Sequence, residues 1–135
     1  MAYTLEFDIR QEYDSRLDGI TIETILSVGD RQATAQAKID PGSAFCLFQR
    51  EIGERLGLMV EDGDPVTIGT LAGTLKAFGH TVTLSTLGLE FESVVYFAAD
   101  YGLPRNLLGR QGWLPKVWLA VIDYDSTIYL RKHDR

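Results

Sequence analysis

Residues 39–45 of this chain read IDPGSAF and place an aspartate between an apolar run and a turn. Asp, Pro, Gly and Ser are all common turn formers, so a loop between two elements explains the stretch by itself. The alternative is that Asp40 carries a functional carboxylate at the end of a strand. The segments on either side are needed to choose between these interpretations.

The residues around Asp40 predict a hairpin before it and a helix after it. Apolar and β-branched residues alternate over GITIETILSV (19–28) and QATAQAKI (32–39), with GDR as the turn. After Asp40, LFQREIGERLGL (47–58) has the apolar spacing of one short helix, and Gly57 suits its C-terminal cap. Asp40 is therefore expected at the point where a strand ends.

Strand patterns dominate the rest of the chain. They cover residues 3–9, a hairpin at about 65–78, HTVTLSTL (80–87), LEFESVVYFA (89–98) and a final hairpin over 117–130. A second short helix is predicted over PRNLLGRQGWL (104–114), opened by Pro104. Many strands with two short helices predict a small, closed all-β structure, since a parallel α/β fold would need helices between most strands.

Composition narrows the classes of protein. With 135 residues and 45% hydrophobic content, one domain with its own core is expected. The net charge of −6 disfavours nucleic acid as a partner. The single cysteine, Cys46, cannot form an intrachain disulfide and is expected to be a buried small apolar residue. The two histidines give no metal-ligand spacing, so neither a metal nor another cofactor is expected.

The N-terminal residues lack the basic and apolar blocks of a signal peptide. No apolar run approaches the roughly 18 residues that a membrane-spanning helix needs. We therefore expect a cytoplasmic protein with no membrane part.

Three motifs follow one another in a recognisable order. The chain resembles the retropepsin-like aspartic proteases, the single-lobe relatives of pepsin found in retroviruses and many bacterial genomes. AKIDPGSAFCLF (37–48) resembles the active-site strand and loop, VTIGTLAGTLKAFG (66–79) the flap, and NLLGRQGWL (106–114) the motif that opens the C-terminal helix. Each motif alone is a weak indication of the family. Asp-x-Gly, for example, recurs in this chain at residues 100–102, which we interpret as a loop.

The resemblance implies a division of the chain. Residues 20–131 would form the acid-protease domain, a closed β-barrel with two short helices and a flap hairpin. Residues 1–19 would form an N-terminal strand and connection, available for a dimer interface, and residues 132–135 a charged tail. Trp113 and Trp118 are expected to pack the second helix and last strand into the core.

The resemblance also implies the chemistry, that of an aspartic endopeptidase. One carboxylate takes a proton from water, and a second, protonated one polarises the peptide carbonyl. Two neighbouring carboxylates cannot both ionise, so they share the proton. This chain has the motif once, which implies a homodimer with Asp40 of each subunit facing across a two-fold axis and a peptide or protein substrate.

Roles for other residues follow from the same resemblance. Gly42 would offer its N–H to the Asp40 carboxylate, and the Ser43 hydroxyl would bind the outer oxygen. The flap would hold an extended peptide and close over it. Its residues would be Gly69, Thr70, Leu71, Ala72 and Gly73, with Leu71 and Ala72 at the tip.

The remaining motif supplies support around the active-site loop. Leu108 and Gly109 would be structural residues that support the active-site loop. Arg110 would either stabilise the active-site region or dimer by ion pairing or remain a solvated charge.

Pro41 departs from the family pattern. The family has Thr or Ser here, and its hydroxyl and backbone N–H clasp the two active-site loops across the dimer axis. Proline has no side-chain donor or acceptor and no N–H. Two alternatives therefore stand beside an active protease: a catalytically weak or inactive dimer serving as a peptide-binding or interaction module, and a monomer that obtains its second aspartate from another protein.

Overall fold

The computed structural model describes residues 1–135, and strands make up most of it. The strands are β1 (Ile9–Glu12), β2 (Thr21–Val28), β3 (Arg31–Ile39), β4 (Leu47–Phe48), β5 (Asp64–Thr70), β6 (Gly73–Thr86), β7 (Leu89–Ala98), β8 (Asn106–Leu108), β9 (Val117–Ile122) and β10 (Thr127–Lys132). The helical elements are α1 (Arg50–Arg55) and the single 3-10 turns η1 (Val60–Asp62), η2 (Leu114–Lys116) and η3 (Asp123–Asp125). None of these helices is long and apolar enough to cross a membrane.

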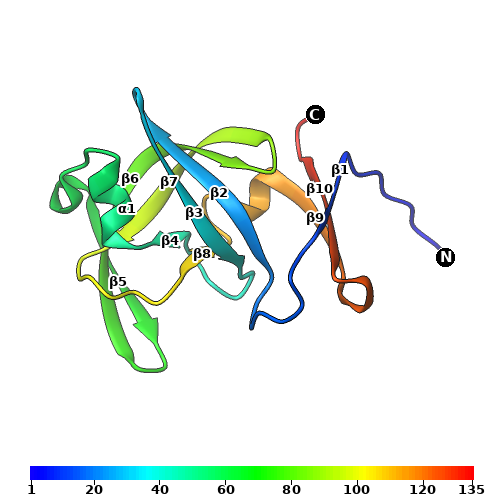
Figure 1. The fold of residues 1–135 in the computed structure, drawn as a ribbon, viewed down its shortest axis with the longest axis horizontal. Coiled ribbons are helices and arrows are strands. Elements are labelled where there is room, and N and C mark those ends of the chain that lie inside the picture. Colours follow the sequence, from blue (N-terminus) through cyan, green and yellow to red (C-terminus); the bar gives the residue numbers. More distant parts are fainter.

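Six strands close into a barrel, which confirms the predicted all-β fold. The order is β2-β3-β8-β4-β7-β6, and pairing of β2 with β6 completes the ring. Strand β5 pairs only with β6 and extends away from the ring as half of a hairpin (Figure 1). The predicted strands over 80–87 and the second half of the 65–78 hairpin form one continuous strand, β6.

The hairpin of β2 and β3 shows why the alternating sequence forms this wall. Ala33, Ala35, Ala37 and Ile39 are buried, whereas the residues between them face outward. This period-two pattern is what a strand with one face on a core requires. Gly29, with φ +60, makes the turn between the strands. The hairpin predicted before Asp40 is therefore confirmed.

Strand β8 lies between the two strands that flank the Asp40 loop. It runs parallel to β3 and antiparallel to β4. The second helix predicted over 104–114 is therefore wrong. Leu108 is 1% exposed and belongs to the barrel core. Gly112, with φ +101, has a backbone conformation that a helix cannot contain, and it precedes η2. The first predicted helix is present but shorter, as α1.

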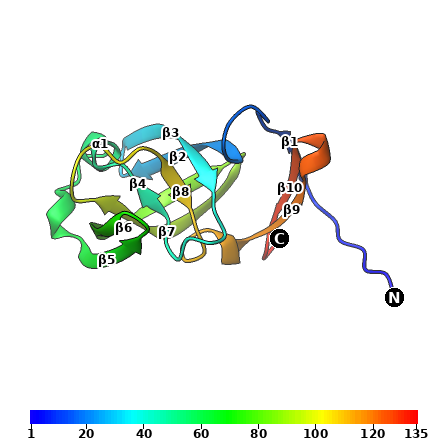
Figure 2. The ribbon, with the colours of Figure 1, turned by 90° about the horizontal axis from the view of Figure 1, so that it is seen from below.

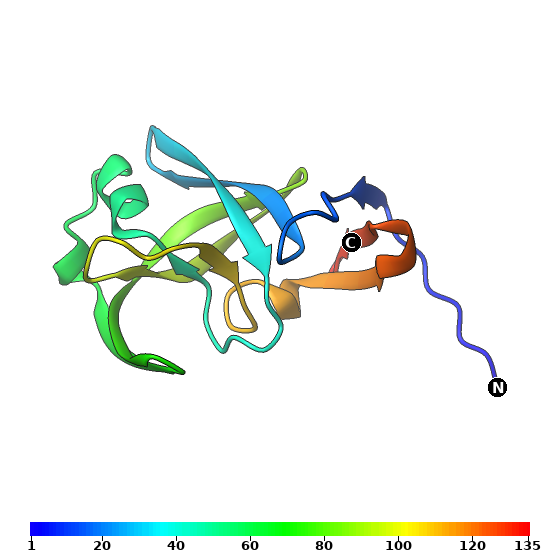
Figure 3. The ribbon, with the colours of Figure 1, turned by 60° about the horizontal axis from the view of Figure 1, so that its bottom comes forward.

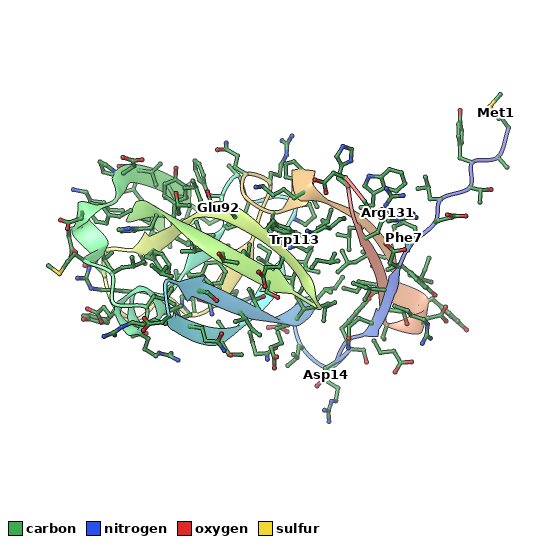
Figure 4. All side chains as sticks on the ribbon, turned by 90° about the horizontal axis from the view of Figure 1, so that it is seen from above. Met1, Phe7, Asp14, Glu92, Trp113 and Arg131 are labelled. Carbon is green, nitrogen blue, oxygen red and sulfur yellow. The ribbon has the colours of Figure 1, made fainter.

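A three-stranded sheet, β1-β10-β9, closes one end of the barrel (Figure 2). Trp113 lies between the barrel and this sheet, as Figure 4 shows. It is fully buried, and its indole N–H donates to the Thr86 hydroxyl over 3.1 Å. The expectation for Trp113 is confirmed, and Trp113 joins the two sheets into one core.

Trp118 does not follow the expectation made for it. It is half-buried on the outer face of the terminal sheet, where the Arg131 guanidinium carbon lies 3.7 Å from the ring centroid. Its indole N–H donates to Nδ1 of His133 over 3.0 Å. Of the predicted tail at 132–135, Lys132 belongs to β10 and His133 contacts Trp118, while Arg135 forms ion pairs with Glu6 and Asp8.

The strand predicted over residues 3–9 is also wrong. Backbone pairing with β10 begins at Asp8, whose N–H donates to the Leu130 carbonyl over 3.0 Å, and β1 itself begins at Ile9. Residues 1–6 extend from the molecule as an exposed arm (Figures 1 and 4). The alternation of Tyr3, Leu5 and Phe7 suits an extended conformation. A strand also needs a neighbouring backbone edge to satisfy its N–H and C=O groups, and the arm has none within this chain.

Candidate active site

Asp40 stands one residue beyond the end of β3. Its backbone N–H donates to the Leu108 carbonyl over 2.9 Å, so the β3–β8 pairing continues to this residue. Its side chain is half-buried, and no cation of the chain pairs with it within 4.0 Å. The strand predicted to present Asp40 therefore does so, at its carboxyl end.

The loop after Asp40 is a tight turn that orients the carboxylate. The Ser43 N–H donates to the Asp40 carbonyl over 3.0 Å, and the Gly42 N–H donates to Asp40 Oδ1 over 3.1 Å. Pro41 occupies the second position of this turn, where its fixed φ is favoured. The turn interpretation and the site interpretation of IDPGSAF are thus compatible, because the turn itself holds the carboxylate.

Ser43 makes a different contact from the one expected. Its hydroxyl donates to the Phe45 carbonyl over 2.8 Å rather than to Asp40. The reason is local, because a serine hydroxyl readily bonds a backbone group two residues away. In this structure Ser43 stabilises the loop that follows the aspartate.

The segment after β8 packs against the same loop. The Arg110 N–H donates to the Ser43 carbonyl, and the Gln111 N–H donates to the Ala44 carbonyl, each over 2.9 Å. A Cβ on Gly109 would lie 2.2 Å from the Phe45 carbonyl oxygen, so only glycine fits there. Leu108, Gly109 and Arg110 therefore lie beside the Asp40 loop.

The side chains of Arg110 and Cys46, both next to the Asp40 loop, lie in opposite environments, one exposed and one buried. The Arg110 side chain is exposed and forms no ion pair within the chain. Cys46 is fully buried against Gly109, and burial raises the pKa of its thiol to about 11. A thiol with that pKa is protonated at neutral pH, so Cys46 is a packing residue, as expected, and a poor nucleophile.

The flap hairpin forms between β5 and β6. Leu71 is fully exposed at its tip, next to Ala72, and Gly73 has φ +126. The Thr70 hydroxyl closes the tip by donating to the Gly73 carbonyl over 2.9 Å. Gly69 has open space around it. The flap and the Asp40 loop project from the same side of the barrel (Figure 3).

The sequence analysis did not identify Asn106, a buried residue that links the elements around the Asp40 loop. Asn106 is 6% exposed, its Oδ1 accepts the Gln49 N–H over 2.8 Å, and its amide donates to the Gln36 carbonyl over 3.0 Å. It therefore joins β3, β8 and the start of α1. The sequence did contain a signal for this role, because Asn106 directly precedes the apolar pair Leu107 and Leu108. An asparagine buried beside such a pair needs hydrogen-bond partners for its amide.

Gln111 was also missed. It pairs with Phe45 in an isolated parallel bridge and thereby fixes the chain after β8 to the Asp40 loop. This contact is made by backbone, so no side-chain signal could have indicated it.

The architecture can be compared with known proteins. No family model and no curated protein matches the sequence. Among solved structures, a retropepsin-like aspartic protease from Rickettsia conorii is similar, with a TM-score of 0.64, 15% identity and coverage of 96% of each chain. The EIAV protease complexed with the inhibitor HBY-793 has a TM-score of 0.53 and 19% identity, covering 69% of this chain and 83% of that one.

These identities are low, so the likeness establishes the fold. It extends over nearly the whole chain in the bacterial case. The Asp-Pro-Gly-Ser loop lies at the carboxyl end of β3, with β8 threaded beside it. By architecture, this chain has the retropepsin-like aspartic protease fold.

Proposed function

We propose that this protein is an aspartic endopeptidase that acts as a homodimer through one Asp40 from each subunit. The single observation that carries the proposal is the half-buried Asp40 carboxylate, held by the Gly42 N–H at the end of a barrel strand on the flap side. The likeness of the whole fold to aspartic proteases supports it.

A dimer is proposed because the chain supplies only half of the chemistry. One carboxylate must be ionised to accept a proton from water, and another must be protonated to donate to the peptide carbonyl oxygen. The second Asp-x-Gly, at Asp100, lies in an exposed loop after β7, and its glycine is followed by Leu103 where Gly42 is followed by Ser43. A two-fold axis beside Asp40 would bring two equivalent carboxylates to about 3 Å, so that they share one proton.

The exposed loop surface and the arm are suited to this assembly. Pro41 and Gly42 are exposed in the single chain. Residues 1–6 form an unpaired extended arm, and β9 is an edge strand of the terminal sheet with Val121 41% exposed and Ile122 45% exposed. Pairing of the arm with a second subunit would satisfy both its backbone and its apolar side chains.

Substrate binding is proposed between the flap and the Asp40 loop. An extended peptide would add to the flap by backbone hydrogen bonds, with alternate side chains in pockets. Flap closure over the peptide would exclude bulk water from the two carboxylates. One water molecule would remain between them to attack the peptide carbonyl.

Pro41 favours one second candidate, a dimer of this fold that binds peptides without cleaving them. Proline cannot form the cross-axis clasp, and a displacement of about 1 Å at a catalytic group costs on the order of a hundredfold in rate. The two candidates share the dimer and differ in whether peptide bonds are hydrolysed.

The test is cleavage of a peptide library between about pH 3 and pH 7, with activity expected toward the acidic side, where a carboxylate pair holds one proton. Wild-type protein should cleave, and Asp40→Asn should abolish cleavage while leaving the dimer intact by sedimentation, because the amide cannot accept the proton. Asp100→Asn is the matched control and should retain full activity. Binding of library peptides without any cleavage by the wild type would instead identify the non-catalytic candidate.

A further inference from the structure

A polar groove lies on the outer face of the barrel, apart from the proposed active site. It is a cavity of 530 Å³ between β3, α1, the segment at 17–19 and the segment at 104–106. Neither Asp40 nor any flap residue lines it. Thr34, Gln36 and Lys38 lie in its wall because they alternate with the inward-facing alanines of β3.

The charge of this groove differs from that of the molecule. Lys38, Arg55 and Arg105 line it, and Asp18 is the only acidic residue in its lining. The protein as a whole carries a net charge of −6. Three cations beside one carboxylate leave an excess of positive charge in the groove. This excess creates a positive field that would attract an anion.

None of these three cations forms an ion pair in the chain. The carboxylate of Glu54, the neighbour of Arg55 in α1, and that of Glu61 are engaged with another cation. They bind Arg50, at 3.2 Å and 2.6 Å respectively. That pairing raises the pKa of the Arg50 guanidinium. The groove cations therefore keep their hydrogen-bonding capacity free for a ligand.

The walls of the groove are rigid. Asn106 links Gln36 of β3 to the start of α1 through two hydrogen bonds, and the Gln49 amide donates to the Leu103 carbonyl over 2.8 Å. The methylene chain of Lys38 lies across Gly19, where an added Cβ would come within 2.6 Å of it. The backbone that carries the cations is thus held in place, and Lys38 is packed along its methylene chain, which lowers the entropic cost of binding.

We propose that this groove binds a small dianionic ligand, a phosphate ester or a dicarboxylate. The cavity volume falls within the roughly 300 to 1,000 Å³ of small-molecule sites. Arginine suits either anion because its planar fork donates two parallel hydrogen bonds to phosphate or carboxylate oxygens. Three cations against one carboxylate leave the charge excess that a dianion neutralises. The site is independent of proteolytic activity.

The experiment titrates the full chain with pyrophosphate, inorganic phosphate and succinate, monitored by NMR chemical shifts and calorimetry. We expect saturable binding by at least one of them with a Kd below about 1 mM, weakened by added salt. Preference for the phosphates over succinate, or the reverse, identifies the anion. Arg55→Gln/Arg105→Gln should raise the Kd at least about tenfold, because each charge-assisted bond is strong.

The control variant removes the same charge outside the groove. Arg31→Gln/Lys132→Gln should leave the Kd within about twofold, since neither residue lines the groove or forms an ion pair. Circular dichroism checks the fold of each variant, and Lys38→Gln tests the site again if the arginine pair does not fold. The proposal is overturned if no small anion binds saturably, or if the control variant loses as much affinity as the groove variant. It is also overturned if a glutamate-rich peptide binds the groove more tightly than every small anion.

Discussion

Pro41 is the departure from the retropepsin-like pattern that bears most on the proposed chemistry. It occupies the second position of a turn whose ends are joined by the Ser43 N–H and the Asp40 carbonyl, 3.0 Å apart. A proline there restricts the loop before any partner binds. We infer that this chain rigidifies its active-site loop from within the subunit, where the family uses a clasp between subunits.

Replacing Pro41 by threonine tests this inference. Pro41→Thr should tighten the dimer or raise the cleavage rate, because threonine restores a hydroxyl and an N–H to the loop. It should also lower monomer stability by about 0.4 to 1 kcal/mol, because the unfolded chain regains conformational freedom. Sedimentation, peptide cleavage and denaturant unfolding measure the three quantities. No change in either dimerisation or rate would mean that the loop is organised differently from the family's.

Gly109 is predicted to tolerate no side chain. Gly109→Ala would bring Cβ to 2.2 Å from the Phe45 carbonyl oxygen and 2.7 Å from the Ser43 carbonyl oxygen. Both are backbone atoms of the Asp40 loop, so the loop must shift, at a cost of about 3 kcal/mol in the free energy of unfolding. Chemical denaturation provides the measurement. Gly69→Ala, which adds a methyl group in open space, should stay within about 0.5 kcal/mol.

Among the elements, the β5–β6 hairpin is the one whose conformation bears most on the proposed function. Gly73→Val should impair cleavage, because φ +126 is a backbone conformation that a β-branched residue adopts only under strain. The expected destabilisation is about 1 to 3 kcal/mol. The matched control is Gly102→Val, at φ +94 in an exposed loop outside the flap.

Comparing the two variants separates strain from function. Both should lower the thermal midpoint to a similar degree, whereas only Gly73→Val should reduce the cleavage rate. Equal rates for the two variants would contradict a role for the flap tip in catalysis.

The element at 104–114 shows where local sequence misleads. Pro104 and the apolar spacing of the leucines favour a helix, yet Asn106–Leu108 is a strand. Strand β3 on one side and β4 on the other both have backbone groups that need partners, and three residues of β8 supply them. The long-range pairing outweighs the weak local preference.

The whole molecule is built around one core that includes the terminal sheet. Ile128 and Leu130 of β10 and Trp113 belong to the same buried cluster as the barrel residues. The linker between sheet and barrel is fixed as well, because the Tyr13 hydroxyl donates to the Asp123 carboxylate, which raises the pKa of Tyr13 to about 12. The sheet that would join two subunits is therefore held in place within each subunit.

Removing residues 1–5 tests the proposed assembly. Met1, Tyr3 and Leu5 are exposed and contribute nothing to the buried core, so the truncated subunit should keep its circular dichroism spectrum and thermal midpoint. Its dimer should be at least about tenfold weaker, because burial of even one large apolar side chain contributes about 1.5 kcal/mol or more. Sedimentation over a concentration series measures the dimer Kd. An unchanged Kd would place the arm outside the interface.

The sequence by itself determined the all-β class, the hairpin leading to Asp40, the first helix, a second hairpin at the place of β5 and the start of β6, and the burial of Cys46. Those features depend on the period of apolar residues and on turn formers, which are local. Only the tertiary structure decided that residues 106–108 form a strand, that residues 3–8 do not, and that Ser43 binds Phe45. It also brought Lys38, Arg55 and Arg105 to one groove. Pairing partners and charge clusters come from segments far apart in the chain, and no local pattern encodes which of them meet.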